Sequence, residues 1–378
     1  MLKINPLSTL YVGIDVSSKS NYICALDFFK NKYINSSFAN NQPGAEELAL
    51  KILECLNQHP DLTMVVAALE STSVYSIHIA NYLSSCEELM RFKPYVFVLN
   101  PKCTANYKKS YIGLGKSDPI DAFVIADYAR AGNIESEPWR GSQFLALKRL
   151  TRHRLHLVEC MTREKTYLIS NLYLKFSELQ MLEGDDQPFC DIYGATSSSV
   201  LMEYLSPEEI LASSEENLIA FLAEKSCNRI KDISKTADLL KKAARDSYRL
   251  DKALYEPLNV SIASSFNCIE TFKREIKVID NAIEKEIKGL NPNAFIILQS
   301  IDGIGPVFAG GIIAEIGDIT AFHSSDALAK YAGLTWKSNQ SGDFYGEDTP
   351  MIKAGNRYLR YYLGEAANSM RKHNVEYG

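Results

Sequence analysis

Residues 12–17, VGIDVS, set a single carboxylate, Asp15, into an otherwise apolar run that extends over Leu10–Val16. The composition of this run is typical of a buried β-strand. Burying an unpaired carboxylate is costly, so Asp15 must face either a polar partner in the core or a site. Two further strand-like runs, Tyr22–Phe29 and Tyr33–Phe38, follow at hairpin spacing.

Two more apolar runs, MVVAAL at residues 64–69 and YVFVL at residues 95–99, have the length and composition of buried strands. Helical periodicity lies between and after them, over residues 43–56, 74–83 and 118–131. Three strands followed by strands that alternate with helices predict a mixed sheet covered by helices. We expect this α/β domain to span residues 8–135.

The rest of the chain is predicted to be all-α. Residues 142–181 form one long basic helical pattern, and apolar residues recur at three- and four-residue steps between Ile269 and Ile287. This spacing indicates a coiled-coil-like hairpin or arm, with the helical pattern interrupted near Pro257. We therefore expect a helical connector over residues 140–290 and a small, Gly-rich helical domain over residues 291–378.

The formal charge of −5, from 41 Lys and Arg against 46 Asp and Glu, at first argues against a nucleic-acid partner. The charge is uneven, however, because residues 178–224 contain 11 acidic residues and no Lys or Arg. Removing the −11 of this acidic block from the total of −5 leaves the other residues at +6. Residues 91–130 and 140–180 carry net charges of +4 and +5, so basic surfaces for nucleic acid are present.

The composition, with 46% apolar and 23% charged residues, is that of an ordinary folded protein. No window approaches the roughly 18 uninterrupted apolar residues of a membrane span, and no signal-peptide pattern precedes the first strand. The 8 cysteines lie at least 17 residues apart and form no CxxC pair, so a zinc ribbon or disulfide framework is not predicted. We expect a cytoplasmic protein with reduced thiols and no membrane partner.

Three further carboxylates accompany Asp15. Glu70 closes the apolar run at residues 64–69, while Asp118 and Asp121 stand at a helix start beside Pro119, where Asp118 is expected to be the N-cap. Each position alone has a structural explanation, as a core partner or a helix cap. Together, four hard oxygen donors suit Mg²⁺, and a pair of such ions can activate both the attacking and the leaving oxygen of a phosphodiester.

The segments GIDVSS (13–18), ALEST (68–72) and KSDPIDA (116–122) resemble, in this order, the DEDD transposases of bacterial insertion sequences. The N-terminal domain of that family resembles the RuvC resolvase, which has an RNase H-like fold. The resemblance continues near the C-terminus, in residues 298–306, 317–319, 331–334 and 339–342.

The resemblance implies an RNA-guided DNA recombinase. In this family a structured non-coding bridge RNA pairs with donor and target DNA, and the protein recombines them. Asp15, Glu70, Asp118 and Asp121 match the metal-binding carboxylates, for two Mg²⁺ or Mn²⁺ ions, and Ser341 matches the serine nucleophile that forms a covalent phosphoserine. Without the resemblance, Ser341 is a turn residue before Gly342, and Ser338 is an alternative nucleophile.

Strand exchange requires four cleavages, so one serine per chain implies a homo-oligomer, a dimer or a tetramer. The expected location is the bacterial cytoplasm, at the nucleoid when the protein is active.

Basic side chains are candidates for phosphate contacts, although a solvated helix face would explain them as well. The candidates beside the carboxylate helix, on the long basic helix and near the C-terminus are Lys102, Lys108, Lys109, Lys116, Lys148, Arg149, Arg152, Arg154, Arg163, Lys353, Arg357 and Arg360. Gly303 and Gly305 lie in a predicted turn between two short helices, which resembles a helix-hairpin-helix. Such glycines bring backbone N–H groups close to a phosphate, and the alternative is a tight helix connection.

Three other functions remain open at this point. One is a non-enzymatic RNA-binding remnant, against which the intact carboxylates and Ser341 argue, and the other two are enzymes. The first is a metal-dependent Holliday-junction nuclease of RuvC type, which needs only the four carboxylates. The second is an actin-like or sugar-kinase-like ATPase, which also begins with a strand of this kind. That class requires a second Gly-rich phosphate loop, and no such loop occurs between residues 100 and 300.

Overall fold

The computed structural model describes residues 4–134, 137–336, 340–341, 344–345 and 349–373. It divides into two compact units. The first, here called the sheet unit, contains residues 1–146 and 317–327. The second, the helical unit, contains residues 147–316 and 328–378.

This grouping differs from the three segments expected from the sequence, because the C-terminal helices pack on the long helices of the connector. Ile283 lies so close to Gly310 that a Cβ added to the glycine would come within 2.6 Å of it. The Tyr362 hydroxyl likewise donates a hydrogen bond of 2.6 Å to the carbonyl oxygen of Thr151.

The sheet unit is built on five strands in the order β3-β2-β1-β4-β5. These are β1 (Thr9–Val16), β2 (Ser20–Leu26), β3 (Lys32–Ala39), β4 (Met64–Glu70) and β5 (Tyr95–Leu99). β1 pairs antiparallel with β2, which pairs antiparallel with β3, while β4 and β5 continue the sheet parallel to β1. The mixed sheet confirms the predicted α/β domain of RNase H-like type.

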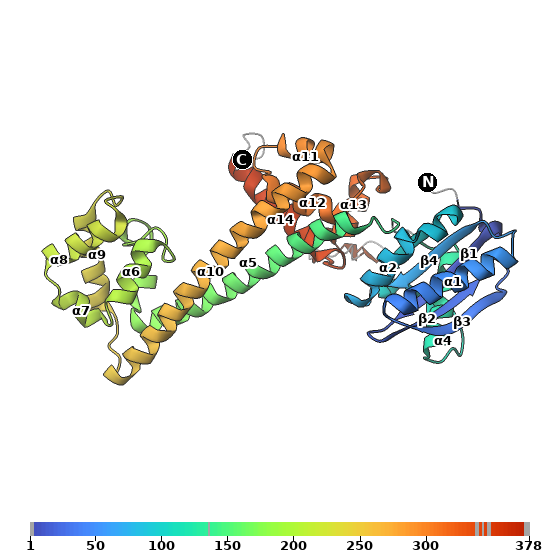
Figure 1. Cartoon of the computed structure of the whole chain (residues 1–378). Helices are drawn as coiled ribbons and strands as arrows, with labels where there is room; N and C mark the ends of the chain where they lie inside the picture. Colours follow the sequence, from blue (N-terminus) through green and yellow to red (C-terminus); the bar gives the residue numbers. More distant parts are fainter. Residues whose placement is uncertain (1–3, 135–136, 337–339, 342–343, 346–348, 374–378) are drawn as a thin grey trace. The chain divides into compact units, whose positions relative to one another are not determined.

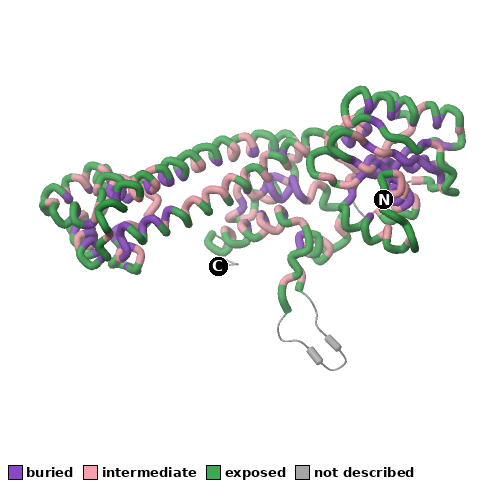
Figure 2. Tube along the Cα trace, turned by 90° about the horizontal axis from the view of Figure 1, so that it is seen from below, coloured by how far each residue is buried: buried purple, intermediate pink, exposed green. Residues whose placement is uncertain are grey.

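Helices cover both faces of this sheet (Figure 1). α1 (Gln42–Gln58) and α2 (Tyr75–Ser85) pack on the face that bears Val12 and Ile14. α4 (Asp118–Arg130) packs on the opposite face. The buried residues, purple in Figure 2, follow the strands between these layers.

Short helices complete the sheet unit. They are η1 (Pro6–Ser8), η2 (Glu87–Phe92), α3 (Pro101–Lys108) and η5 (Ile319–Ala321).

The close approach of α4 to β1 depends on the missing side chain of Gly13. A Cβ at this position would come within 2.2 Å of the Ala122 carbonyl oxygen and 2.3 Å of the Ala126 nitrogen. Both contacts are with helix backbone, which cannot give way as the end of a side chain can. Any residue larger than glycine therefore pushes α4 away from the strand.

The helical unit is organised by two long antiparallel helices, α5 (Ser142–Lys175) and α10 (Lys252–Leu290) (Figures 1 and 2). Arg154 on α5 donates to Asp280 on α10 at 2.5 Å, and the Ser265 hydroxyl donates to Glu164 at 2.6 Å. Four members of the predicted apolar repeat are buried: Ile269, Ile276, Ile283 and Ile287. This arrangement is the coiled-coil-like hairpin expected from the sequence.

The helical break was expected near Pro257, but it lies before α10, because α9 ends at Asp246 and α10 begins at Lys252. Pro257 lies inside α10, as its sixth residue, and the helix continues through it. Because proline has no backbone N–H, the helical hydrogen bond to the Ala253 carbonyl is absent there.

The acidic block folds with the residues after it into a helical cap on one end of this hairpin. Its elements are η3 (Glu178–Gln180), η4 (Gly184–Asp186), α6 (Ala195–Glu203), α7 (Pro207–Ala212), α8 (Glu215–Ser226) and α9 (Ile233–Asp246). The cap is held to the hairpin by Lys175, whose ammonium donates to the Leu201 carbonyl at 2.6 Å and to Asn259 at 2.5 Å. Burial lowers the pKa of Lys175 to about 8.

The C-terminal elements are α11 (Pro292–Gln299), α12 (Pro306–Ile316), α13 (Ser325–Ala332), β6 (Gln340–Ser341), β7 (Phe344–Tyr345) and α14 (Arg357–His373). No helix among the described residues has the length and apolarity needed to cross a membrane. All eight cysteines are free thiols in this structure.

The contact at Gly13 generates a prediction. We expect Gly13→Ala to lower the free energy of unfolding by about 2–4 kcal/mol, because the methyl group overpacks against helix backbone. Unfolding in urea can be followed by the fluorescence of Trp139, which packs on the sheet core. Gly115→Ala is the matched control, because no atom lies within 4 Å of its Cβ position. Equal stability of the two variants would contradict the packing described.

Candidate active site

Asp15 and Glu70 lie side by side at the ends of two neighbouring parallel strands. The register pairs Ile14 of β1 with Leu69 of β4, so the next residue of each strand is a carboxylate. Side chains alternate between the faces of a sheet, so both carboxylates are on the same face as Gly13, towards α4. Both residues are partly buried.

The other two carboxylates stand in the first turn of α4. Ser117 occupies the N-cap position that was expected for Asp118, and its carbonyl oxygen accepts from the backbone N–H groups of Ile120 and Asp121. Asp118 is thus the first helical residue and is exposed, whereas Asp121 is partly buried. Because α4 lies on β1, its first turn faces the ends of β1 and β4.

The electrostatics of Asp15 show that the four carboxylates act on one another. The pKa of Asp15 is raised to about 6, chiefly by burial and then by the charges of Asp121, Asp118 and Glu70, in that order of effect. Lys108 acts in the opposite direction. The four residues predicted from two strands and one helix therefore share one electrostatic environment.

Two side chains of α3 complete this environment. The Lys108 ammonium forms an ion pair with Asp121, and the Thr104 hydroxyl donates a hydrogen bond to Glu70. Lys108 was predicted as a phosphate contact, and Thr104 was not predicted at all.

The donor set fits a divalent cation in its chemistry, since it consists of hard carboxylate oxygens that repel one another. Among the described residues, however, no three His, Cys, Asp or Glu side chains are arranged closely enough to hold a metal ion.

A further carboxylate, Asp127, anchors both helices of the site. It is completely buried and accepts hydrogen bonds from Tyr107 at 2.9 Å, from Arg130 at 2.6 Å and from Tyr111, and it forms an ion pair of 3.2 Å with Lys30. Burial alone would raise the pKa of Asp127, but the hydrogen bonds from Tyr111, Arg130 and Tyr107 lower it. No local sequence pattern marks Asp127 as a site residue, because its partners come from three separate segments.

Ser341 lies in the helical unit, in the two-residue strand β6, where it pairs with Phe344 of β7. Its side chain and the alternative nucleophile Ser338 lie outside the described residues. The chain on either side of this region is closed by a bridge between Trp336 and Met351 and by a hydrogen bond of 2.8 Å from the Ile352 nitrogen to the Thr335 carbonyl.

A buried carboxylate, Glu315 of α12, fixes the base of the segment that carries Ser341. Glu315 accepts two hydrogen bonds from Arg152, at 2.7 and 2.9 Å, and one of 2.8 Å from the Asn356 amide. Asn356 also caps α14 through the Tyr358 and Leu359 nitrogens. Although burial alone would raise the pKa of Glu315, the Arg152 hydrogen bond and the charges of Lys148 and Arg152 lower it.

Several predicted phosphate contacts are thus engaged within the protein. Lys148 lies 3.8 Å from Glu315, and the pairs Arg152–Glu315 and Arg154–Asp280 join α5 to other helices. Arg357 pairs with Glu159 on the surface, and Arg360 donates to the carbonyl oxygens of Ala332 and Lys353. Besides Arg357, the candidates with exposed side chains are Lys102, Lys109, Lys116, Arg149, Arg163 and Lys353.

Gly303 and Gly305 occur between α11 and α12, as expected for a turn between two helices. Gly303 has a φ of +95°, and a Cβ there would come within 2.8 Å of the Met370 nitrogen on α14. Packing against α14 therefore accounts for this glycine. A Cβ at Gly305 would meet no atom within 4 Å, so close packing does not account for this second glycine.

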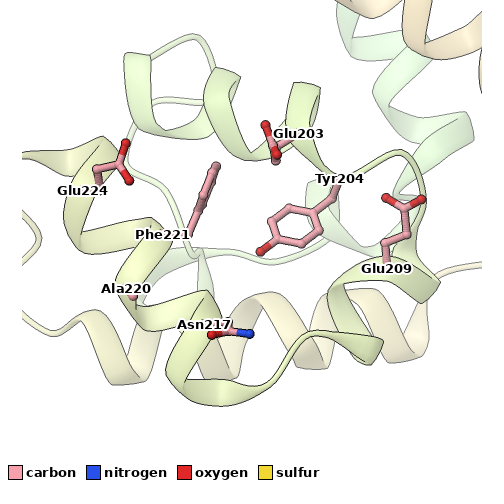
Figure 3. Close-up of a pocket in the computed structure, with 7 residues that line it drawn as sticks. All are labelled: Glu203, Tyr204, Glu209, Asn217, Ala220, Phe221 and Glu224. Atoms are coloured by element: carbon pink, nitrogen blue, oxygen red, sulfur yellow. The ribbon is translucent and has the colours of Figure 1, made fainter.

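The acidic block also forms a shallow cavity of about 510 Å³ (Figure 3). Its walls include the rings of Tyr204 and Phe221, 5.7 Å apart and edge to face, and the carboxylates of Glu203, Glu209 and Glu224. Of the residues predicted to act in catalysis or nucleic-acid binding, none lines this cavity.

Comparison with known proteins gives two family matches. Residues 12–177 match a model of the IS110 DEDD group described as a transposase, and residues 296–377 match a model described as the transposase IS116/IS110/IS902 family. The first match includes all four carboxylates, and the second includes Ser341.

Among individual relatives, an uncharacterised 42 kDa protein of insertion element IS900 from Mycobacterium paratuberculosis is 25% identical, over 94% of this chain and 83% of that protein. An uncharacterised 44.8 kDa protein of insertion element IS116 from Streptomyces clavuligerus is 24% identical, over 96% of this chain and 85% of that protein. A pilin gene-inverting protein of Moraxella lacunata is 26% identical, over 42% of this chain and 46% of that protein.

Because the pKa of Asp15 is raised, we expect that removing its charge by substitution stabilises the protein, and that the size of this effect depends on pH. The pKa is 3.8 for the unperturbed side chain and about 6 in the fold. The charged form is therefore disfavoured in the folded state, so its penalty is fully present above pH 6 and disappears as the pH falls towards 4. In metal-free buffer, we expect Asp15→Asn to raise the free energy of unfolding by about 1–2 kcal/mol at pH 8, after allowance for partial exposure.

Urea unfolding followed by Trp139 fluorescence measures this effect, and the gain should shrink as the pH is lowered from 6 to 4. Glu47→Gln, which removes an exposed carboxylate on α1, is the control and should change stability by less than about 0.5 kcal/mol. A loss of stability in Asp15→Asn at pH 8 would show that the carboxylates do not repel one another as described.

The Glu315 network predicts a large difference between two glutamates. Glu315→Ala leaves Arg152 and Asn356 without their buried partner, so we expect a loss of about 2–4 kcal/mol. Glu159→Ala removes the exposed partner of Arg357 and should cost less than about 1 kcal/mol. Thermal unfolding of both variants tests this, and losses of similar size would mean that Glu315 does not hold the helices together.

Proposed function

Because the chain belongs to the DEDD transposases of insertion sequences, we propose that it cuts and rejoins donor and target DNA through a covalent bond between Ser341 and a DNA phosphate. Asp15, Glu70, Asp118 and Asp121 are the proposed ligands of one or two divalent metal ions, with Mg²⁺ as the first choice and Mn²⁺ as an alternative. The observation that carries this proposal is the mutual electrostatic effect of the four carboxylates, centred on the raised pKa of Asp15.

In the proposed reaction the Ser341 hydroxyl attacks a phosphodiester and loses its proton, a new O–P bond forms, and the P–O3′ bond breaks. The leaving 3′ oxygen takes up a proton, and the 5′ phosphate stays on the serine until another 3′ hydroxyl reverses the step. A divalent cation would stabilise the negative charge on the oxygens of the phosphate. The bond energy is kept in the phosphoserine, so the ends can be rejoined without an external energy source.

Rejoining rather than hydrolysis is supported by the relatives. The Moraxella protein is named for inverting a pilin gene, a change in which cut DNA ends are joined again. The Holliday-junction nuclease is the alternative, and it needs the carboxylates but no serine.

We also propose that a structured bridge RNA selects the two DNA sites. The resemblance to the RNA-guided family and the exposed cations Arg149 and Arg163 on α5 support this part of the proposal. Since strand exchange needs four cleavages and each chain has one such serine, the active form is proposed to be a dimer or a tetramer.

Substitution of the serine tests the proposal. The protein, purified with its bound RNA, is incubated with labelled donor and target DNA and Mg²⁺, and SDS gels detect DNA that migrates with protein. We expect an adduct for the wild type and for Ser338→Ala, none for Ser341→Ala, and a strong reduction for Asp15→Asn. Digestion of the RNA before DNA is added should prevent adduct formation.

DNA cleavage that persists in Ser341→Ala, with free ends and no adduct, would favour the nuclease instead. An adduct that survives RNA digestion would exclude RNA guidance while leaving the serine reaction intact.

A further inference from the structure

The loop between α3 and α4 presents an unusual apolar tip. Ile112 has a relative exposure of 102%, the highest value among the exposed large apolar side chains of the described residues. Leu114, two residues on, is also exposed. Single exposed apolar residues are common on protein surfaces. Whether Ile112 and Leu114 have a function must therefore be judged from the residues around them.

The loop is anchored at both ends. The Tyr111 hydroxyl donates to the buried Asp127, and its ring packs edge to face against Tyr107 at 5.8 Å and Phe123 at 6.1 Å. At the other end, the Ser117 carbonyl accepts from the first turn of α4. The apolar tip is therefore the exposed part of a loop whose two ends are hydrogen-bonded to α4.

The surroundings of the tip are cationic. Lys109 and Lys116 flank it in the chain, and both have exposed side chains. The core of a protein–protein interface is depleted in lysine and needs a broader apolar patch than two side chains. Lysines around a small apolar projection instead match the DNA-bending proteins that insert Ile, Leu, Phe or Met between base pairs while cations hold the backbone.

The tip is also close in the chain to the carboxylates. Ile112 and Asp118 are six positions apart in the sequence, and a chain of that length spans at most about 21 Å. At about 3.4 Å per nucleotide, this reach corresponds to about six nucleotides from a phosphate held at the carboxylates.

We propose that Ile112, supported by Leu114, is a wedge that enters the DNA stack and unstacks a base step near the phosphate being cut, while Lys109 and Lys116 contact the backbone. The proposal rests on the proposed function in that DNA must lie along the carboxylate face. A kinked duplex exposes its phosphodiester more than a straight one, so the wedge gives the loop a role in preparing the substrate.

The test measures base unstacking separately from chemistry. The full chain is bound to a short DNA duplex and treated with permanganate, which oxidises unstacked thymines. The duplex is rich in thymine, so unstacking is detected wherever the protein binds along it. We expect the wild type and Ile112→Leu to produce reactive thymines and Ile112→Ser to lose them. Leu50→Ser is the matched control, because Leu50 is also exposed but lies on α1, on the other face of the sheet.

Binding is measured alongside by fluorescence anisotropy. Ile112→Ser should weaken affinity by no more than about tenfold with an unchanged salt dependence, because phosphate contacts supply most non-specific binding. Lys109→Ala combined with Lys116→Ala should reduce the salt dependence instead. Thymines that stay reactive in Ile112→Ser, or stay unreactive with the wild type, overturn the wedge.

The covalent adduct assay, run on the same variants, separates this proposal from the proposed function. If the wild type forms the adduct but does not unstack thymines, the wedge proposal is wrong and the recombinase proposal stands. If Ile112-dependent unstacking occurs but no adduct forms, the serine mechanism is wrong and the wedge proposal stands.

Discussion

The contact between α4 and the backbone of β1 is the constraint on which the candidate site depends. It exists because residue 13 has no side chain, so the carbonyl oxygen of Ala122 and the nitrogen of Ala126 can approach the strand directly. That approach puts the first turn of α4, with Asp118 and Asp121, over the strand ends that carry Asp15 and Glu70. The site is therefore assembled by backbone packing, and only its charges are supplied by side chains.

Two buried carboxylates, Asp127 and Glu315, then fix helices that are not positioned by the sheet alone. In the sheet unit, Asp127 ties α3 and α4 to the β2–β3 hairpin through Tyr107, Arg130 and Lys30. In the helical unit, Glu315 joins α12 to α5 and to the start of α14. Both are acidic residues with full sets of partners, which distinguishes them from Asp15, whose carboxylate is surrounded mainly by like charge.

Sequence reasoning found the elements whose signals are local. The strand ends at Asp15 and Glu70 and the helix start at Asp118 were visible because each depends on a few neighbouring residues. Asp127 and Glu315 were missed, since their partners Lys30 and Arg152 lie 97 and 163 residues away. For the same reason, the sequence predicted that the cations of α5 contact nucleic acid. In the structure, Arg152 pairs with Glu315 and Arg154 pairs with Asp280. The two-unit division was also hidden, because the contact of Gly310 with Ile283 links α12 to a helix of the predicted connector.

The ion pair between Lys108 and Asp121 has a thermodynamic consequence. A cation that binds Asp121 must exchange with an ammonium group that already neutralises it, which lowers the affinity of the empty protein for that cation. A DNA phosphate nearby would offer Lys108 a second counter-ion and release Asp121. Under the proposed function, DNA and metal each make the binding of the other more favourable, and by linkage the two effects are equal. The protein would thus bind its metal ions more tightly when a substrate is in place.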